Sequence, residues 1–171
     1  MVPTLSQIEA YTTDHLVAAA DHWDGLADRW EDAHWQVRNQ AHVLDWQGAA
    51  ADALRARTIS DYTVANSQAD QLRSTSRIAR QQAGYLDQLR NRVLYAVEDA
   101  HDAGFIVGED LSVTDSRISC TAAELAARQA QAQIFSAEIR SRAGALVGAD
   151  TSVAGDLSSA AAGVGDTRFE I

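Results

Sequence analysis

The chain has 171 residues, 46% of them hydrophobic, and carries 24 acidic against 14 basic residues, for a formal net charge of −10. This length and hydrophobic content suffice for one domain with a buried core. The negative charge repels nucleic-acid phosphates and anionic membranes, so we expect no nucleic-acid partner. No stretch reaches the roughly 18 consecutive apolar residues that a membrane span needs.

The N-terminus and the cysteine usage set two further expectations. Residues 1–7 contain neither a basic leader nor an apolar run, which predicts that a conventional signal peptide is absent. Cys120 is the single cysteine. An internal disulfide is therefore excluded, while an intermolecular one stays open.

The first predicted helix begins near Gln7. Ser6 and Glu9 form the pattern of a capping box, in which each side chain bonds the other residue's backbone amide. Apolar residues then recur at alternating spacings of three and four, the period of a left-handed coiled-coil seam. They are Leu16, Ala19, Trp23, Leu26, Trp30, Ala33 and Val37. This pattern predicts one long helix that ends near Val43 and Leu44.

A short turn separates this helix from a second one. We expect Asp45 to cap the second helix, Gly48 to let two backbones approach closely, and Trp46 to fold over the end of the hairpin.

The second helix is predicted from Ala49 to about Ala100. Its apolar line in heptad phase is Leu72, Ala79, Leu86, Val93, Val97 and Ala100. A second line beside it consists of Ile78, Tyr85 and Leu89. Two apolar lines predict packing partners on two sides.

A third helix is predicted after a loop. Gly104 is expected to end the second helix, and residues 105–111 to form a loop whose apolar side chains cover the end of the bundle. A capping-box pattern from Ser112 to Asp115 predicts the start of a helix that reaches about Ala160. Its predicted seam is Ile118, Ala122, Leu125, Ala132, Ile139, Ala143, Leu146, Val153 and Leu157.

Together these elements predict an all-α protein. We expect an elongated antiparallel helical hairpin and a third long helix, packed as a three- or four-helix coiled-coil-like bundle. The hairpin occupies residues 1–102, and the loop and third helix of the same bundle occupy residues 103–162. Residues 163–171 are predicted to be a flexible tail.

Patterns that carry catalysis or bind metals are scarce. The chain has no Gly-rich phosphate loop, nucleophile elbow or Cys-x-x-Cys pair. His15 and His22 share a helical face, but about 10 Å of helix separates them, too far for one metal ion without a third element. Glu109 and Asp110 resemble a catalytic acid pair, although adjacent carboxylates in loops are usually just solvated. We therefore expect no catalytic residue, no metal and no cofactor.

The tryptophans differ in position. Trp23 and Trp30 lie on the predicted seam with Leu26, so this group is predicted to form an assembly core, packed against the second helix or a partner. Trp35 lies off the seam and is expected to be partly exposed. Trp46 lies in the turn, where it either caps the hairpin core or takes part in recognition.

Near the end of the second helix, Tyr95 and Asp99 share one helical face and can present a phenol and a carboxylate together. A Trp-x-Gly turn followed by this Tyr-x-x-x-Asp pair resembles the WXG family, the helical-hairpin substrates of type VII, or ESX, secretion in actinobacteria and related bacteria. The resemblance covers about residues 6–102. Trp46 and Gly48 match the turn motif. Tyr95 and Asp99 match the export signal.

The resemblance implies that two hairpins pair antiparallel into a four-helix bundle, as a homodimer or as a heterodimer with a WXG-like helical partner. The Trp-x-Gly turn of one subunit would then lie near the Tyr-x-x-x-Asp of the other, and the secretion ATPase would recognise this two-part surface. It also implies export without a conventional signal peptide. The third helix has no counterpart in the minimal hairpin. It either fills the groove that a partner would occupy, lengthens the dimer interface or leads to a cargo domain.

Three functional hypotheses follow. The first is a non-enzymatic secreted substrate or targeting module of a type VII secretion system, which is cytoplasmic before export. The second is a structural coiled-coil or scaffold protein that stays in the cytoplasm. The third is an enzyme whose site lies in the loop at residues 104–115.

Overall fold

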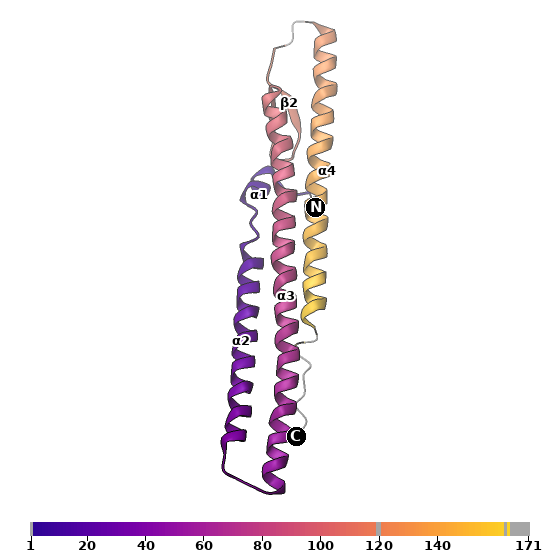
Figure 1. Ribbon diagram of the computed structural model, residues 1–171. Helices are drawn as coiled ribbons and strands as arrows, with labels where there is room; N and C mark the ends of the chain where they lie inside the picture. Colours follow the sequence, from indigo (N-terminus) through magenta and orange to yellow (C-terminus); the bar gives the residue numbers. More distant parts are fainter. Residues whose placement is uncertain (1, 119–120, 163, 165–171) are drawn as a thin grey trace. The chain divides into compact units, whose positions relative to one another are not determined.

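The computed structural model describes residues 2–118, 121–162 and 164 (Figure 1). These residues form the helices α1 (Leu5–Ala10), α2 (Asp14–Val43), α3 (Ala49–Asp102) and α4 (Ala122–Ala161). A small antiparallel sheet joins β1 (Phe105–Val107) to β2 (Val113–Asp115). The all-α prediction is therefore confirmed. Cys120 and the predicted flexible tail, apart from Val164, lie outside the described residues.

The chain divides into two compact units. Unit 1 consists of Met1–Thr13 and Ala83–Ala154, and unit 2 of Asp14–Gln82 and Gly155–Ile171. The helices α3 and α4 each contribute residues to both units.

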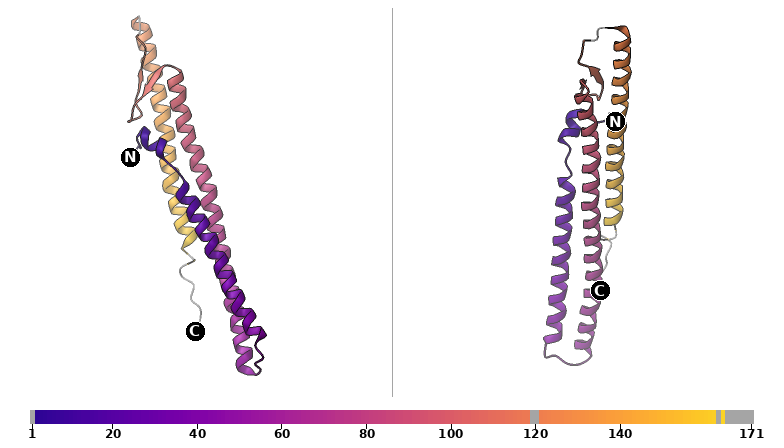
Figure 2. Two further views of the ribbon diagram at one scale, coloured as in Figure 1. Left: turned by 90° about the vertical axis from the view of Figure 1, so that its left-hand side faces the viewer. Right: turned by 45° about the horizontal axis from the view of Figure 1, so that its top comes forward.

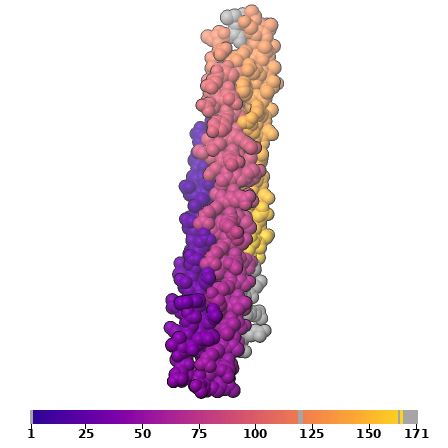
Figure 3. All heavy atoms as spheres, in the orientation of Figure 1, coloured from indigo at the N-terminus to yellow at the C-terminus, as the bar shows by residue number. Residues whose placement is uncertain are grey.

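In unit 2, α2 runs antiparallel to the first part of α3, and the two are joined by a short turn (Figure 1). Side chains of the two helices pack directly against each other on the face seen in Figure 3. The end of α4 lies beside the same part of α3, where the Gln71 side chain donates to the Ala160 carbonyl at 3.3 Å. The buried apolar residues of α2 and of the first part of α3 are mostly small. They are Leu16, Ala20, Ala27 and Ala41 of α2 and Ala51, Ala65, Ala69, Leu72 and Ala79 of α3.

The predicted heptad line of α3 is confirmed, because all six of its residues are buried. The structure extends the line toward the N-terminus by Ala51, Thr58 and Ala65, so that every seventh residue from Ala51 to Ala100 is buried. The sequence pattern missed these three positions because alanine and threonine give a weak hydrophobic signal.

The predicted seam of α2 is partly wrong. Leu16 is buried as expected, but Val37 is 55% exposed and Ala33 is also exposed. Ala20 and Ala27, one position away from predicted seam residues, are fully buried instead. Small side chains allow the two helix axes to approach closely, and this moves the contact line to the alanines while the larger residues flank it.

The first predicted helix was expected to be continuous from near Gln7 to Val43 and Leu44. In the structure it is interrupted at residues 11–13, which separate α1 from α2. The helix α1 starts two residues earlier than expected, with a capping box between Thr4 and Gln7 in place of Ser6 and Glu9. It ends after Ala10, where Tyr11 has an extended backbone and the Arg90 side chain donates to the carbonyls of Ile8 and Glu9. Both views in Figure 2 place α1 beside the last part of α3, within unit 1.

The core of unit 1 uses larger side chains than the contact of unit 2. Its buried cluster joins α1, α3, the hairpin and α4. The members are Ile8, Val93, Ala96, Val97, Ala100, Phe105, Val107, Leu111, Ala132, Ile139 and Ala143. Leu5, Leu94 and Phe135 pack against this cluster. Burying a large aliphatic or aromatic side chain contributes roughly 1.5–3 kcal/mol, so this cluster is the main apolar core of the unit.

The predicted loop at residues 105–111 is wrong in part, because β1 forms a hairpin with β2. Arg128 of α4 holds this hairpin in place. Its guanidinium binds both carboxylate oxygens of Asp115, at 2.6 and 3.0 Å, and lies 3.7 Å from the centre of the Phe105 ring. It also donates to the carbonyls of Ala103 and Gly104, directly after α3. The Arg128 guanidinium lowers the pKa of Asp115 to about 2.

The third long helix starts later than predicted. Residues 112–115 belong to the hairpin, and α4 begins at Ala122 with a capping box between Thr121 and Glu124. Ile118, at 97%, and Leu125, at 46%, are exposed, and so is Ala122, so the first part of the predicted seam is wrong. From Ala132 to Leu157 the predicted seam residues are buried, as expected.

Candidate recognition site

The turn between α2 and α3 is short and tightly defined. The last backbone bond of α2 runs from the Leu44 amide to the Gln40 carbonyl, and the first of α3 from the Asp52 amide to the Gly48 carbonyl. Gly48, and not Asp45, therefore occupies the N-cap position of α3. Its φ is +105°, which favours glycine. A Cβ at this position would meet nothing within 4 Å, so the glycine serves its backbone conformation and not the predicted close approach.

Trp46 is accessible in this turn. Its side chain is 47% exposed, and the neighbouring Leu44 is 53% exposed. Both backbone carbonyls accept hydrogen bonds from the same nitrogen, Nη2 of Arg55, at 2.8 Å for Trp46 and 3.2 Å for Leu44. The turn thus has a fixed backbone and exposed apolar side chains.

Tyr95 and Asp99 lie one helical turn apart on the exposed side of α3. Tyr95 is 61% exposed, and Asp99 is also exposed. The neighbouring Ala96, Val97 and Ala100 are buried in the core of unit 1, so the helix cannot rotate about its axis without breaking that core. The core therefore fixes the face on which the phenol and the carboxylate are presented.

The three residues of the predicted assembly core, Trp23, Leu26 and Trp30, flank the contact between α2 and α3. Trp23 and Leu26 are partly buried against a cluster of Ala27, Ala69 and Leu72. Trp30 is half-buried, with its ring centre 6.5 Å from that of His34. Trp35 is 50% exposed. The structure thus brings the turn motif and the seam residues into unit 2, while Tyr95 and Asp99 belong to unit 1.

A ladder of ion pairs joins α2 to α3 in unit 2. Two arginines of α3, seven residues apart, each bind two carboxylates of α2. Arg80 binds Asp21 at 2.6 Å and Asp24 at 2.7 Å. Arg73 binds Asp28 at 2.8 Å and Glu31 at 2.6 Å. These four pairs add polar contacts that favour the observed register of the hairpin.

The electrostatics of the ladder agree with its geometry. Hydrogen bonds to Asp28 and Glu31 raise the pKa of Arg73, and those to Asp21 and Asp24 raise the pKa of Arg80. Burial alone would raise the pKa of Asp24, but its hydrogen bonds with Arg80 and Ser76 outweigh burial and lower the pKa.

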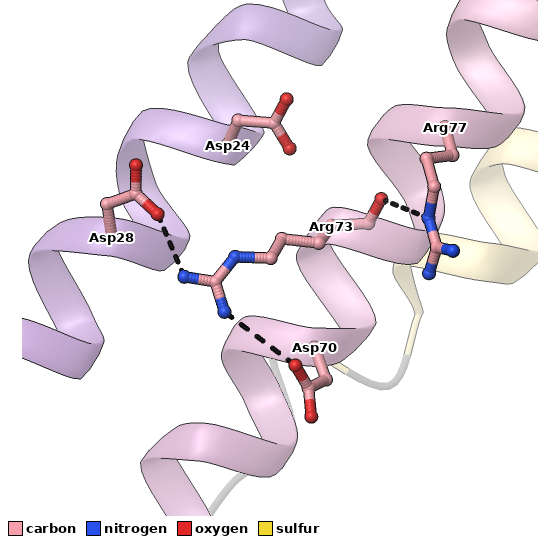
Figure 4. A pocket seen from close by; sticks show the side chains of 5 residues that line it. All are labelled: Asp24, Asp28, Asp70, Arg73 and Arg77. Atoms are coloured by element: carbon pink, nitrogen blue, oxygen red, sulfur yellow. Dashed lines mark hydrogen bonds and ion pairs between the residues drawn. The ribbon is translucent and has the colours of Figure 1, made fainter.

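An open groove of about 770 Å³ lies beside the ladder (Figure 4). It is lined by Asp24, Asp28, Asp70, Arg73 and Arg77. Figure 4 shows that Arg73 reaches from α3 to Asp28 on α2, while Arg77 donates to the backbone carbonyl of Arg73. Sequence reasoning missed the ladder, although the carboxylates at spacings of three, four and three, opposite arginines seven apart, are a readable signal.

The acid pair considered for catalysis has structural partners. Glu109 accepts hydrogen bonds from the Ser6 hydroxyl, at 2.6 Å, and the Ser6 amide, and these bonds lower its pKa. Ser112 lowers the pKa of Asp110 in the same way. The bonds of Glu109 tie α1 to the hairpin turn, and that of Asp110 lies within the turn itself. Within the described part of the chain, no three His, Cys, Asp or Glu side chains are grouped as metal ligands.

The fold is that of a helical-bundle protein, and the candidate site residues are exposed on it: Trp46 in the turn of unit 2, and Tyr95 and Asp99 on α3 in unit 1. Over the described residues, the helices are all too short or too polar to cross a membrane. No protein-family model matches the chain, and no solved structure matches it.

Two similar proteins come from mycobacteria. An uncharacterized protein of Mycobacterium tuberculosis is 53% identical over 169 residues, which cover 99% of this chain and 52% of that protein. The same values hold for an uncharacterized protein of Mycobacterium bovis. The chain thus spans about half the length of these relatives.

Proposed function

We propose that this protein is a non-enzymatic substrate or targeting module of a type VII secretion system. In this proposal, Tyr95 and Asp99 form the export signal, and Trp46 and Gly48 form the complementary turn motif. The secretion ATPase recognises these surfaces, and the protein leaves the cytoplasm by a route that does not use a signal peptide.

The main support is the placement of the motif residues. Tyr95 and Asp99 are exposed side by side on a helix whose opposite side is locked into a core. Trp46 is half-exposed in a turn whose glycine has a positive φ. Because exposed aromatic side chains contribute little to folding, their presence on rigid elements favours a role in recognition.

Pairing with a second helical hairpin is part of the proposal. The partner is either a second copy or a WXG-like protein. Val37, Leu54 and Ile59 of unit 2 are exposed, which leaves apolar surface that a helical partner can cover. The relatives agree with the proposal in one respect, because mycobacteria are actinobacteria, the group in which the resembled family is secreted.

Secretion of point variants from a mycobacterial host with an active type VII system tests the export signal. We expect Tyr95→Ala and Asp99→Asn to block export, because each removes one of the two recognised groups. Both positions are exposed, so the unfolding free energy should stay within about 0.5 kcal/mol of the wild type. Blotting of culture filtrate and cell lysate measures export, and chemical denaturation measures stability.

Glu98→Gln is the matched control. Glu98 is exposed on the same helix, next to Asp99, and loses one charge in the same way. We expect this variant to be exported normally. Export of Tyr95→Ala at the wild-type level would overturn the proposal.

A cytoplasmic scaffold is the second candidate, and the heptad line of α3 favours it. Buried residues at every seventh position from Ala51 to Ala100 are typical of a long coiled-coil scaffold. This alternative predicts a stable homo-oligomer that stays in the cell lysate. Light scattering on the purified protein, together with the culture-filtrate blot, separates the two functions.

A further inference from the structure

We propose that Arg55 is a positioning residue that holds the Trp-x-Gly turn in the conformation that presents Trp46. This inference rests on the proposed function, because it concerns how the turn motif is displayed for recognition. Arg55 lies outside both motifs, and in this proposal its hydrogen bonds keep the turn ordered.

The contacts of Arg55 lead to this inference. Its Nη2 donates to the Leu44 carbonyl at 3.2 Å and to the Trp46 carbonyl at 2.8 Å. These carbonyls follow the end of α2, where backbone acceptors have no partner within the helix. One planar guanidinium can satisfy two such acceptors at once because its N–H groups have a fixed geometry. Arg55 thus supplies bonds that the turn lacks.

Arg55 is itself held in place. Its Nη1 lies 3.4 Å from the Asp52 carboxylate, one helical turn earlier in α3. The Arg55 side chain is only 27% exposed, whereas that of Asp52 is 76% exposed. The arginine therefore lies under the turn and ties it to the first turns of α3.

The result is an apolar surface on a fixed backbone. Val43, Leu44 and Trp46 are all exposed in or beside the turn, and Leu54 of α3 is exposed as well. A free loop with such side chains would have to be ordered when a partner binds, and this ordering lowers affinity. Because Arg55 orders the turn in advance, its effect should be on recognition more than on folding.

Amide hydrogen exchange and NMR on the Arg55→Met variant test whether Arg55 keeps the turn ordered. Methionine is of similar length but cannot donate to the carbonyls. We expect exchange at the Leu44 and Asp52 amides, which are hydrogen-bonded at the two ends of the turn, to rise about tenfold, because the turn loses two hydrogen bonds to its carbonyls. The indole N–H signal of Trp46, assigned with Trp46→Phe, should shift or broaden. Exchange in the rest of α2 and α3 should not change.

Two variants serve as controls. Arg55→Lys keeps a charged donor at the same place and should restore most of the wild-type exchange and export. Arg57→Met removes an arginine two residues further along, whose guanidinium binds Asp61 and not the turn. We expect Arg57→Met to leave both the Trp46 signal and export unchanged.

Export of the same variants completes the test. The proposal is supported if Arg55→Met loosens the turn and reduces export at least several-fold, while Arg55→Lys and Arg57→Met do neither. It is overturned if exchange at the Leu44 and Asp52 amides stays at the wild-type rate, or if the turn loosens while export stays unchanged. Normal export of Trp46→Ala would instead overturn the role of the turn in secretion. The two failures can be told apart, because hydrogen exchange on the purified protein measures the effect of Arg55 on the turn independently of export.

Discussion

Units 1 and 2 use the same helix, α3, but build their interiors differently. In unit 1, the buried cluster contains large side chains such as Ile8, Phe105, Leu111 and Ile139. In unit 2, the buried apolar residues of the helix contact are mostly alanines. The buried side chains of unit 1 are therefore larger on average, and we expect unit 1 to resist unfolding more strongly.

The difference shows what specifies each unit. Large side chains of varied shape fit together in only one arrangement, so the core of unit 1 specifies its own packing. An alanine contact is nearly the same after a slip of one helical turn, so it specifies register poorly. In unit 2 the two arginines that each bind two carboxylates add polar contacts that favour the observed register.

The site residues follow the same division. Tyr95 and Asp99 are presented by a helix that the core of unit 1 holds from behind. Trp46 is presented by a turn in which the Leu44 and Trp46 carbonyls accept hydrogen bonds from Arg55. One half of the proposed surface thus depends on apolar packing, and the other half on polar contacts.

The largest expected effect is on the core of unit 1. Ile139 of α4 is fully buried, so Ile139→Ala removes apolar contacts and leaves a cavity. We expect it to lower the unfolding free energy by about 2–5 kcal/mol, measured by chemical denaturation. Ile134→Ala, at a position 66% exposed on the same helix, should change it by less than about 0.5 kcal/mol. Similar losses for both variants would show that unit 1 has no such core.

Much of the fold could be predicted because its long helices carry repeating apolar patterns. The heptad line of α3 and the later seam of α4 were readable since both lines contain large residues such as Leu86 and Ile139. The break after α1 could not be predicted from the sequence. It depends on contacts from distant parts of the chain, among them Arg90 at the helix end and Asp150, which accepts from the Tyr11 hydroxyl at 2.7 Å.

The candidate site was predictable as motifs but not as geometry. Trp46, Gly48, Tyr95 and Asp99 stand out by type and spacing in the sequence. Arg55 does not, because nothing in a local pattern shows that its side chain reaches back to the carbonyls of a preceding turn. Such a contact exists only once both helices are packed.

A smaller effect is expected from two glycines that differ in backbone conformation and in their place relative to α3. An added Cβ would meet nothing within 4 Å at either Gly48 in unit 2 or Gly84 in unit 1. Gly48 has a φ of +105°, so Gly48→Ala should lower the unfolding free energy by about 1–2 kcal/mol. Gly84 lies inside α3, so Gly84→Ala should raise it by about 0.5–1 kcal/mol. Denaturation curves that shift in the same direction would contradict this interpretation of the turn.

The smallest expected effect is on the ladder of unit 2. Arg73→Gln removes the ion pairs with Asp28 and Glu31, which are partly exposed. We expect a loss of about 0.5–1 kcal/mol at low salt. Because the screening length at 1 M salt is about 3 Å, close to the length of these pairs, the difference from the wild type should become clearly smaller there. Chemical denaturation at the two salt concentrations measures both values.

Arg77→Gln is the control for the ladder, since Arg77 donates to a backbone carbonyl beside the same groove. Its effect should be small and should not depend on salt. If Arg73→Gln instead destabilised the protein equally at both salt concentrations, the arginine would act through packing of its aliphatic stem. The register of unit 2 would then depend on apolar contacts, as in unit 1, and the contrast between the two units would lose its electrostatic basis.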